Sequence, residues 1–219
     1  MAALLMVAFN THAQLHIGLS ANIGNWLSYT PNSPGLKTPP TISGSLNFAY
    51  IATLKNERFI QFGADVGVLG YLMWTNRIDT FPDPYYDDPE VFGNYSAVYG
   101  NLSLMAGKEI KIGEKTLMLG TGGGVSFYYP DWSSGYGLTV DGHKIFSAST
   151  HGPASGAQPF VKVVAQLKPN EKTIVGLGYT HHFNSLLEGS YEFYHTATPS
   201  SGAIKLYPKE FNLTFMYRI

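Results

Sequence analysis

Apolar residues recur at every second position along most of this chain, and small or polar residues fill the positions between them. This period of two predicts β-strands, because successive side chains of a strand point to opposite faces. Eight segments show the pattern, each long enough, at about nine to twelve residues, to cross a bilayer as a tilted strand. The segments are residues 15–24, 41–54, 60–72, 97–106, 117–129, 160–167, 174–183 and 211–219.

The apolar faces of these segments carry no charged residue. Of the 14 basic and 15 acidic residues, only Asp65, Lys162 and Arg218 fall inside the segments, and all three belong to the polar face. A water-facing strand surface normally carries Lys and Glu, whereas these polar faces carry Gly, Ser, Thr, Asn and Gln. We therefore expect the apolar faces to meet lipid and the three charged residues to form a charge cluster in the lumen, with Arg218 close to the periplasmic rim.

The connections between the segments alternate in length. Short charged turns lie at 55–58, 108–115 and 168–172, and long loops lie at about 27–40, 75–94, 130–157 and 185–204. Outer-membrane barrels have short turns on the periplasmic side and long loops on the outside. The pattern therefore predicts an all-β fold, an eight-stranded antiparallel up-and-down transmembrane β-barrel with short periplasmic turns and four long extracellular loops.

The N-terminus is similar to the end of a secretory signal peptide. Residues 1–13 hold a short apolar run that ends in Ala13 before Gln14, although the positive start of such a peptide is missing. We expect a signal-peptide remnant at 1–13, with a truncated start left open, and a single barrel domain at 14–219. A buried N-terminal turn is the alternative. No later stretch approaches the roughly 18 apolar residues of a membrane helix.

Composition narrows the possible functions. A formal net charge of −1 provides no basic field for holding phosphates, so we expect no nucleic-acid partner. Zero Cys excludes thiolate metal sites, cysteine nucleophiles and disulfides. We expect no cofactor.

The C-terminus has apolar residues at every second position up to the last one, at Phe211, Leu213, Phe215, Tyr217 and Ile219. This segment resembles the β-signal recognised by the outer-membrane assembly machinery, although such signals usually end in Phe or Trp. With the eight segments, the chain resembles the small OmpA-type and OmpX-type outer-membrane barrels of Gram-negative bacteria. The resemblance implies a monomer in the outer membrane, with membrane lipid, lipopolysaccharide and the assembly machinery as partners.

Two groups of side chains suggest chemistry. His181, His182, Ser185 and Glu188 supply the residue types of a nucleophile, a base and an orienting acid. They faintly resemble the lipid A deacylase barrels, but neither His has a Ser two residues later; the alternative is polar-tipped rings at the outer rim. Carboxylates also gather in one predicted loop and could bind Ca²⁺, but they lack EF-hand spacing, and a solvated acidic loop is the alternative. They are Asp83, Asp87, Asp88 and Glu90.

Three classes of function follow from this architecture. An eight-stranded barrel is just wide enough to be filled by its own side chains, which disfavours a diffusion pore. The leading hypothesis is a non-enzymatic surface protein whose barrel anchors loops for envelope structure, adhesion or ligand contact. The alternative is a membrane-embedded hydrolase that modifies lipid or lipopolysaccharide through the His181, His182, Ser185 and Glu188 cluster. A soluble lipocalin-like binder is the third class.

Overall fold

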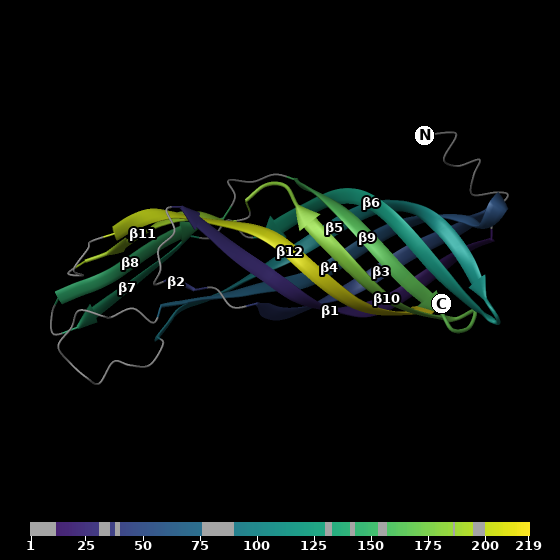
Figure 1. The fold of residues 1–219 in the computed structure, drawn as a ribbon, viewed down its shortest axis with the longest axis horizontal. Helices are drawn as coiled ribbons and strands as arrows, with labels where there is room; N and C mark the ends of the chain where they lie inside the picture. The colour runs from purple at the N-terminus through teal and green to yellow at the C-terminus, as the bar shows by residue number, and fades with distance from the viewer. Residues whose placement is uncertain are drawn as a thin grey trace.

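The computed structural model describes residues 12–30, 36–37, 40–75, 90–129, 133–140, 143–152, 157–185, 187–194 and 200–219. Within them, eight strands form the barrel, in the order β1-β3-β4-β5-β6-β9-β10-β12, and β1 pairs with β12 to close it. Every neighbouring pair is antiparallel, and the strands lie strongly tilted (Figure 1). The barrel strands are β1 (His12–Thr30), β3 (Thr41–Leu54), β4 (Arg58–Thr75), β5 (Glu90–Ile112), β6 (Lys115–Tyr129), β9 (Gln158–Lys168), β10 (Thr173–His182) and β12 (Ser200–Arg218).

The eight strands confirm the predicted closed barrel and its strand order. Among the described residues, no helix is long and apolar enough to cross a membrane. The three predicted turns are short: η1 (Lys55–Glu57) joins β3 to β4, and a hairpin with Gly113 at a φ of +60° joins β5 to β6. Between β9 and β10, the side chain of Asn170 accepts hydrogen bonds from the backbone N–H groups of Lys172 and Thr173, both at 2.9 Å.

Several strands extend further than the apolar pattern predicted, mainly on the long-loop side, and β5 also extends towards its short turn. β5 has 23 residues and β1 and β12 have 19 each. Parts of the predicted loops are also strands: β2 (Leu36–Lys37), β7 (Ser133–Val140), β8 (His143–His151) and β11 (Leu187–Phe193). The long connections are therefore partly strand, because strands outside the membrane need no apolar outer face and lose the alternation that marks the membrane-spanning part.

The additional strands continue the sheet beyond the barrel. β11 pairs with the first residues of β12, β8 pairs with β11, and β7 pairs with β8. Figure 1 shows β7, β8 and β11 together at the end of the molecule opposite the short turns. We call the sheet formed by β7, β8, β11 and residues 200–206 of β12 the outer extension.

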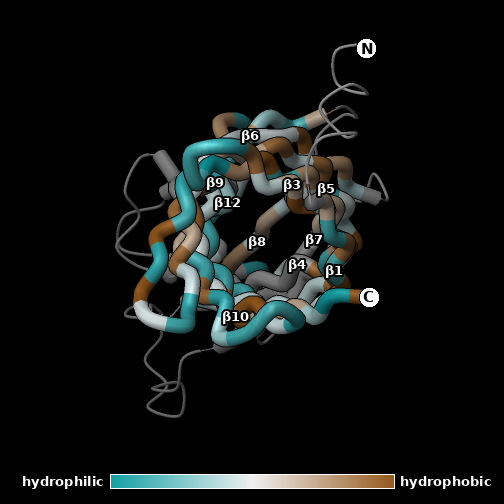
Figure 2. Tube along the Cα trace, turned by 90° about the vertical axis from the view of Figure 1, so that its right-hand side faces the viewer, coloured by the Kyte–Doolittle hydropathy of each residue, from teal (hydrophilic) through white to brown (hydrophobic). Residues whose placement is uncertain are grey.

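The two faces of the barrel have the predicted composition. The lumen is lined by buried polar side chains, and a ring of apolar side chains is exposed on the outside. Val66, Leu102 and Phe215 are 52%, 55% and 55% exposed, whereas Ser45 and Asn47, on the inner face of β3, are 7% and 5% exposed. Figure 2, viewed along the barrel axis, shows the strands arranged as a closed ring. The exposed apolar ring is the surface that a bilayer would cover, and we call it the lipid belt.

Aromatic and aliphatic side chains fill the lumen near the short turns. This core consists of Ala49, Ile51, Phe59, Met118, Ile174 and Met216. Glycine makes room for its largest member, because a Cβ at Gly120 would lie 2.7 Å from Cζ of Phe59. The periplasmic end of the lumen is therefore packed with side chains.

We expect Val66→Arg to destabilise the barrel by about 2–4 kcal/mol, because it would place a charge near the middle of the lipid belt. Unfolding in lipid vesicles, followed by heat-modifiable gel mobility, measures the change. The matched control is Ser149→Arg at an exposed position of β8. That site lies in the outer extension, where water solvates the guanidinium, so its cost should stay within about 0.5 kcal/mol. Equal costs for the two variants would show that the belt is wrongly assigned.

Candidate functional site

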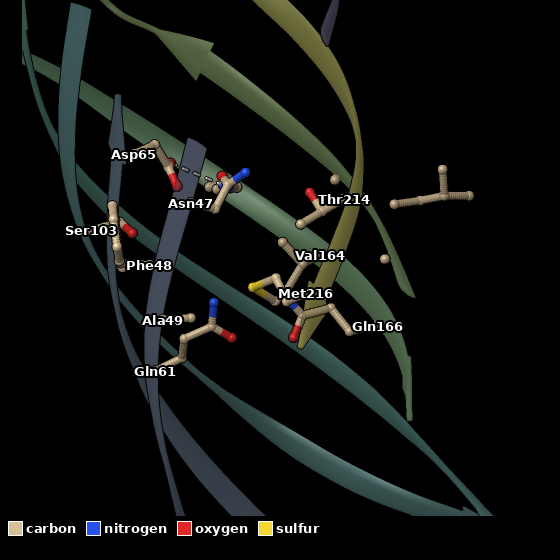
Figure 3. A pocket seen from close by; sticks show the side chains of 15 residues that line it. Asn47, Phe48, Ala49, Gln61, Asp65, Ser103, Val164, Gln166, Thr214 and Met216 are labelled. Atoms are coloured by element: carbon tan, nitrogen blue, oxygen red, sulfur yellow. Dashed lines mark ion pairs between the residues drawn. The ribbon is translucent and has the colours of Figure 1, made fainter. Parts of the chain in front are cut away.

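An ion pair crosses the middle of the lumen. Nζ of Lys162 on β9 lies 3.6 Å from Oδ2 of Asp65 on β4, and the two side chains are 15% and 11% exposed. The dashed line in Figure 3 marks this pair, with Asn47, Ser103 and Gln166 around it. The structure thus brings together the two residues that the strand pattern predicted to meet.

Side-chain hydrogen bonds link the strands on the inner face. Asn22 donates to the Tyr99 hydroxyl at 3.0 Å and accepts from Asn212 at 2.8 Å, and Thr180 donates to Asn212 at 3.0 Å. A second group joins Asn47 to Ser20 at 2.9 Å and Ser20 to Thr214 at 2.7 Å. These bonds satisfy polar groups that have lost water and hold β1, β3, β5, β10 and β12 together from inside.

The space left beside the ion pair is very small. A void of about 20 Å³ is lined by Asp65, Lys162, Gln61 and Gln166, among others. This volume holds about one water molecule. The described part of the lumen therefore contains a packed polar interior around Asp65 and Lys162.

Glu210 is a lumen residue that sequence reasoning missed. It lies on β12, is 5% exposed, and interacts electrostatically with both Lys162 and Asp65. Arg218 lies opposite His16 at the periplasmic end, close to the rim as predicted and away from Asp65 and Lys162. The central cluster thus consists of two carboxylates and one ammonium group, Asp65, Glu210 and Lys162, and Arg218 lies apart from it.

A second ion pair lies at the periplasmic rim. Nζ of Lys168 is 3.3 Å from Oε1 of Glu109, which also accepts a hydrogen bond from Thr53 at 3.1 Å. The pair connects β5, β9 and β3 just beside the short turns. Its position indicates that the pair holds these strands together and does not form a binding site.

The structure separates the four residues of the predicted catalytic cluster. His182 is 2% exposed, and its Nε2 hydrogen-bonds to Ser126 at 2.9 Å and approaches the Tyr128 hydroxyl at 3.4 Å. The neighbouring His181 ring packs against Phe183 with 5.4 Å between ring centroids. Since adjacent residues of a strand point to opposite faces, the two histidines cannot share one site.

Of the other half of that cluster, Glu188 lies on β11 in the outer extension and Ser185 lies just before that strand. Ser185 donates a hydrogen bond directly to Glu188, whose carboxylate also lies 3.6 Å from Nζ of Lys205. No hydrogen bond joins His181 or His182 to this pair in the described part of the chain. In a catalytic triad the histidine lies between the hydroxyl and the acid, so this arrangement does not provide a base for Ser185.

Most of one predicted site lies outside the described residues. Of the acidic loop, Asp83, Asp87 and Asp88 lie outside them, and Glu90 is the first residue of β5. The C-terminal segment is described, and Phe211, Leu213, Phe215, Tyr217 and Ile219 are all exposed in the lipid belt. Its role as an assembly signal stays a prediction.

Comparisons with known proteins show the class of fold. No protein-family model matches the sequence, and no curated protein matches it significantly. The outer membrane protein OprG from Pseudomonas aeruginosa has 10% identity and a TM-score of 0.50, over 95% of this chain and 97% of that chain. Neisserial surface protein A has 8% identity and a TM-score of 0.40, over 94% and 99%. The outer membrane protease OmpT from Escherichia coli has 9% identity and a TM-score of 0.41, over 94% and 96%.

At such low identity these likenesses bear on the fold and not on activity. The chain has the fold of the small eight-stranded outer-membrane barrels. An antiparallel barrel without open edges, surrounded by a belt of exposed apolar side chains, is a structure built to span a bilayer. Fold and belt together are those of an outer-membrane type of barrel that spans a bilayer.

We expect Asp65→Asn and Lys162→Met both to destabilise the barrel, and Lys162→Met to do so by about 3–5 kcal/mol, since it leaves the buried charge of Asp65 unpaired. Lys162→Met should cost more, because it leaves Asp65 and Glu210 facing each other, whereas Asp65→Asn leaves Lys162 beside Glu210. The double variant should cost less than Lys162→Met alone, because Glu210 then no longer faces a second carboxylate. Unfolding of all three variants in detergent measures the coupling, and additive effects would show that Asp65 and Lys162 do not interact. Arg218→Met at the rim is the control and should cost less.

The hydrogen bond from Ser185 holds the pKa of Glu188 below its usual value by stabilising the carboxylate, and the nearby ammonium group of Lys205 acts in the same direction. A lowered pKa in the folded state contributes stability above the ordinary pKa of Glu, and this contribution is lost as pH falls through the lowered value. We expect Ser185→Ala to raise the pKa of Glu188, as measured by NMR titration of its carboxyl carbon. Ser149→Ala, on the same sheet, should leave it unchanged.

Proposed function

We propose that this protein is a non-enzymatic, monomeric surface protein whose barrel anchors the outer extension for contact with a ligand outside the cell. The observation that supports this most directly is the packed lumen, with a void of only about 20 Å³ beside the central ion pair. A narrow eight-stranded barrel with side chains paired across its middle leaves little room for a solute, so a function in diffusion is disfavoured.

The position of the outer extension supports the same proposal. From Phe211, at the upper edge of the lipid belt, β12 continues to Ser200. A rise of about 3.3 Å per residue and a tilt of about 40° put Ala203 roughly 20 Å beyond Phe211. Four paired strands at that height form a rigid surface outside the membrane, where binding residues are commonly found.

The contacts of the predicted catalytic residues disfavour the hydrolase alternative. His182 is bonded to Ser126 inside the lumen, whereas Ser185 is bonded to Glu188 in the outer extension. The likeness to the protease OmpT has a TM-score of 0.41 and carries no argument for an activity.

Cysteine labelling in intact cells tests which side of the membrane the outer extension occupies. The chain contains no Cys, so a single introduced thiol is the sole reactive site. We expect Ser149→Cys to react with a membrane-impermeant maleimide in intact cells. Glu171→Cys, exposed in the short turn between β9 and β10, is the matched control and should react only after the outer membrane is permeabilised.

Two results would contradict the proposal. A reversed labelling pattern would place the outer extension on the periplasmic side. Release of fatty acid from lipid A by the purified protein, abolished by His182→Ala, would show that the protein is an enzyme.

A further inference from the structure

The exposed face of the outer extension contains a groove of about 760 Å³. Strand register arranges its floor in two rows that cross the sheet from β7 to β12. One row is Gly137, Ser147, Glu192 and Ser201, and the other is Gly135, Ser149, Ser190 and Ala203. Neighbouring strands lie about 4.8 Å apart, so each row is roughly 14 Å long.

We propose that this groove binds a neutral oligosaccharide, an inference that rests on the proposed function and names the chemical class of its ligand. The floor consists of glycine, alanine and serine apart from Glu192, so it is flat and polar. Each serine hydroxyl both donates and accepts hydrogen bonds, as the hydroxyl groups of a sugar do. Such a floor suits a chain of sugar rings lying along it.

Two further side chains, Lys144 and Tyr194, lie beside Glu192 and Ser147 at one end of the groove. The Tyr194 hydroxyl donates to Oε2 of Glu192 at 2.6 Å and lies 3.2 Å from the Ser147 hydroxyl. Nζ of Lys144 lies 5.1 Å from the centroid of the Tyr194 ring. A carboxylate, an ammonium group and a phenol thus occur together beside the serine floor. The carboxylate accepts hydrogen bonds from sugar hydroxyls, and an aromatic ring packs against the apolar face of a sugar.

The charge of the groove distinguishes this ligand from others. Lys144 and Glu192 balance each other at one end, and Glu188 and Lys205 form an ion pair in the next row towards the membrane, with Nζ to Oε1 at 3.6 Å. A site for sulfate or phosphate groups needs an excess of cations, which these four residues do not provide. An acyl chain would leave the serine hydroxyls of the floor without water, at a cost. A neutral, hydroxyl-rich ligand avoids both penalties.

The groove can be blocked without disturbing the sheet. At Gly135 an added Cβ would meet no atom within 4 Å. Gly135→Trp therefore places a large ring over the floor while the backbone keeps its conformation. Gly44 on β3 is the matched control position, because its nearest atom to an added Cβ is at 3.6 Å and it lies on the outer, lipid-facing side.

The experiment measures oligosaccharide binding by the full chain in phospholipid nanodiscs, which avoids sugar-headed detergents that would compete. Maltohexaose, cellohexaose and chitohexaose are titrated by calorimetry, with sucrose octasulfate as the polyanionic comparison. We expect saturable binding of at least one neutral hexasaccharide. Gly135→Trp should weaken that binding about tenfold or more, whereas Gly44→Trp should leave it unchanged.

A second pair of variants examines the end of the groove. Tyr194→Leu should weaken binding more than Tyr194→Phe, because the phenylalanine ring still packs against the sugar. Heat-modifiable gel mobility, equal to that of the unaltered protein, verifies that each variant is folded.

Three outcomes would overturn the inference: no neutral saccharide binds, binding is unaffected by Gly135→Trp, or sucrose octasulfate binds more tightly than every neutral sugar. If the labelling of Ser149→Cys still reports an extracellular position, only the ligand class is wrong and the proposed surface function stands. If that labelling also fails, the proposed function fails with it.

Discussion

Closure of the sheet is the constraint on which the rest of this structure depends. Inside a bilayer no water is available for backbone N–H and C=O groups, so every strand needs a partner on both sides. The pairing of β1 with β12 meets this need from His16 opposite Arg218 to Thr30 opposite Ala203. Bonds at the very end continue it, since the N–H of Ile219 donates to the carbonyl of Leu15 at 3.1 Å. Once closed, the barrel part of the sheet has no edge that could pair with another chain.

Closure with only eight strands then determines what the lumen can contain. Such a barrel is narrow, so inward side chains from opposite walls must pack and pair with each other. Here an apolar core around Phe59 fills the periplasmic end and hydrogen-bonded Asn, Ser and Thr fill the middle, where Asp65 meets Lys162. The interior is therefore used for packing and for pairing between strands.

The membrane-spanning part of the fold could be predicted from sequence because lipid imposes a strict rule on one face. Outward positions such as Val66 and Phe215 must be apolar, and the alternation therefore identifies both the strands and their orientation. The proximity of Asp65 and Lys162 followed from the same pattern, because both face inward at similar distances from short turns. These predictions need only local periodicity and turn length.

Glu210 could not be found in that way. It lies just before Phe211, where the apolar alternation begins, in a stretch that also contains Pro208 and Lys209 and looks like a loop. In the structure, Pro208 lies at the register shift between β1 and β12, near Gly24 and Trp26. The regular pairing is interrupted there, so a residue without a backbone N–H is tolerated. The strand therefore continues through a proline and two charged residues, and the third member of the central cluster lies inside it.

Sequence reasoning missed the outer extension because the apolar and polar faces of the sheet are reversed there relative to the barrel. On β12, the exposed residues of the belt are apolar, as at Phe211, and the buried ones are polar, as at Asn212 with 7% exposure. Further out on the same strand, Ile204 is fully buried at 0% exposure, whereas Lys205 and Ser201 are exposed. β8 and β11 follow the second rule, with Phe146 and Tyr191 buried and Ser149 and Ser190 exposed.

This reversal follows the solvent outside the barrel. Where lipid surrounds the sheet, the outer face must be apolar and closely packed against acyl chains, so a floor of serine and glycine there would lose both contacts and hydration. Where water surrounds it, small polar residues cost little on the exposed face, and the large apolar residues move to the buried one. A groove with a serine floor can therefore form only beyond the belt, and the outer extension supplies four paired strands at that height to carry it.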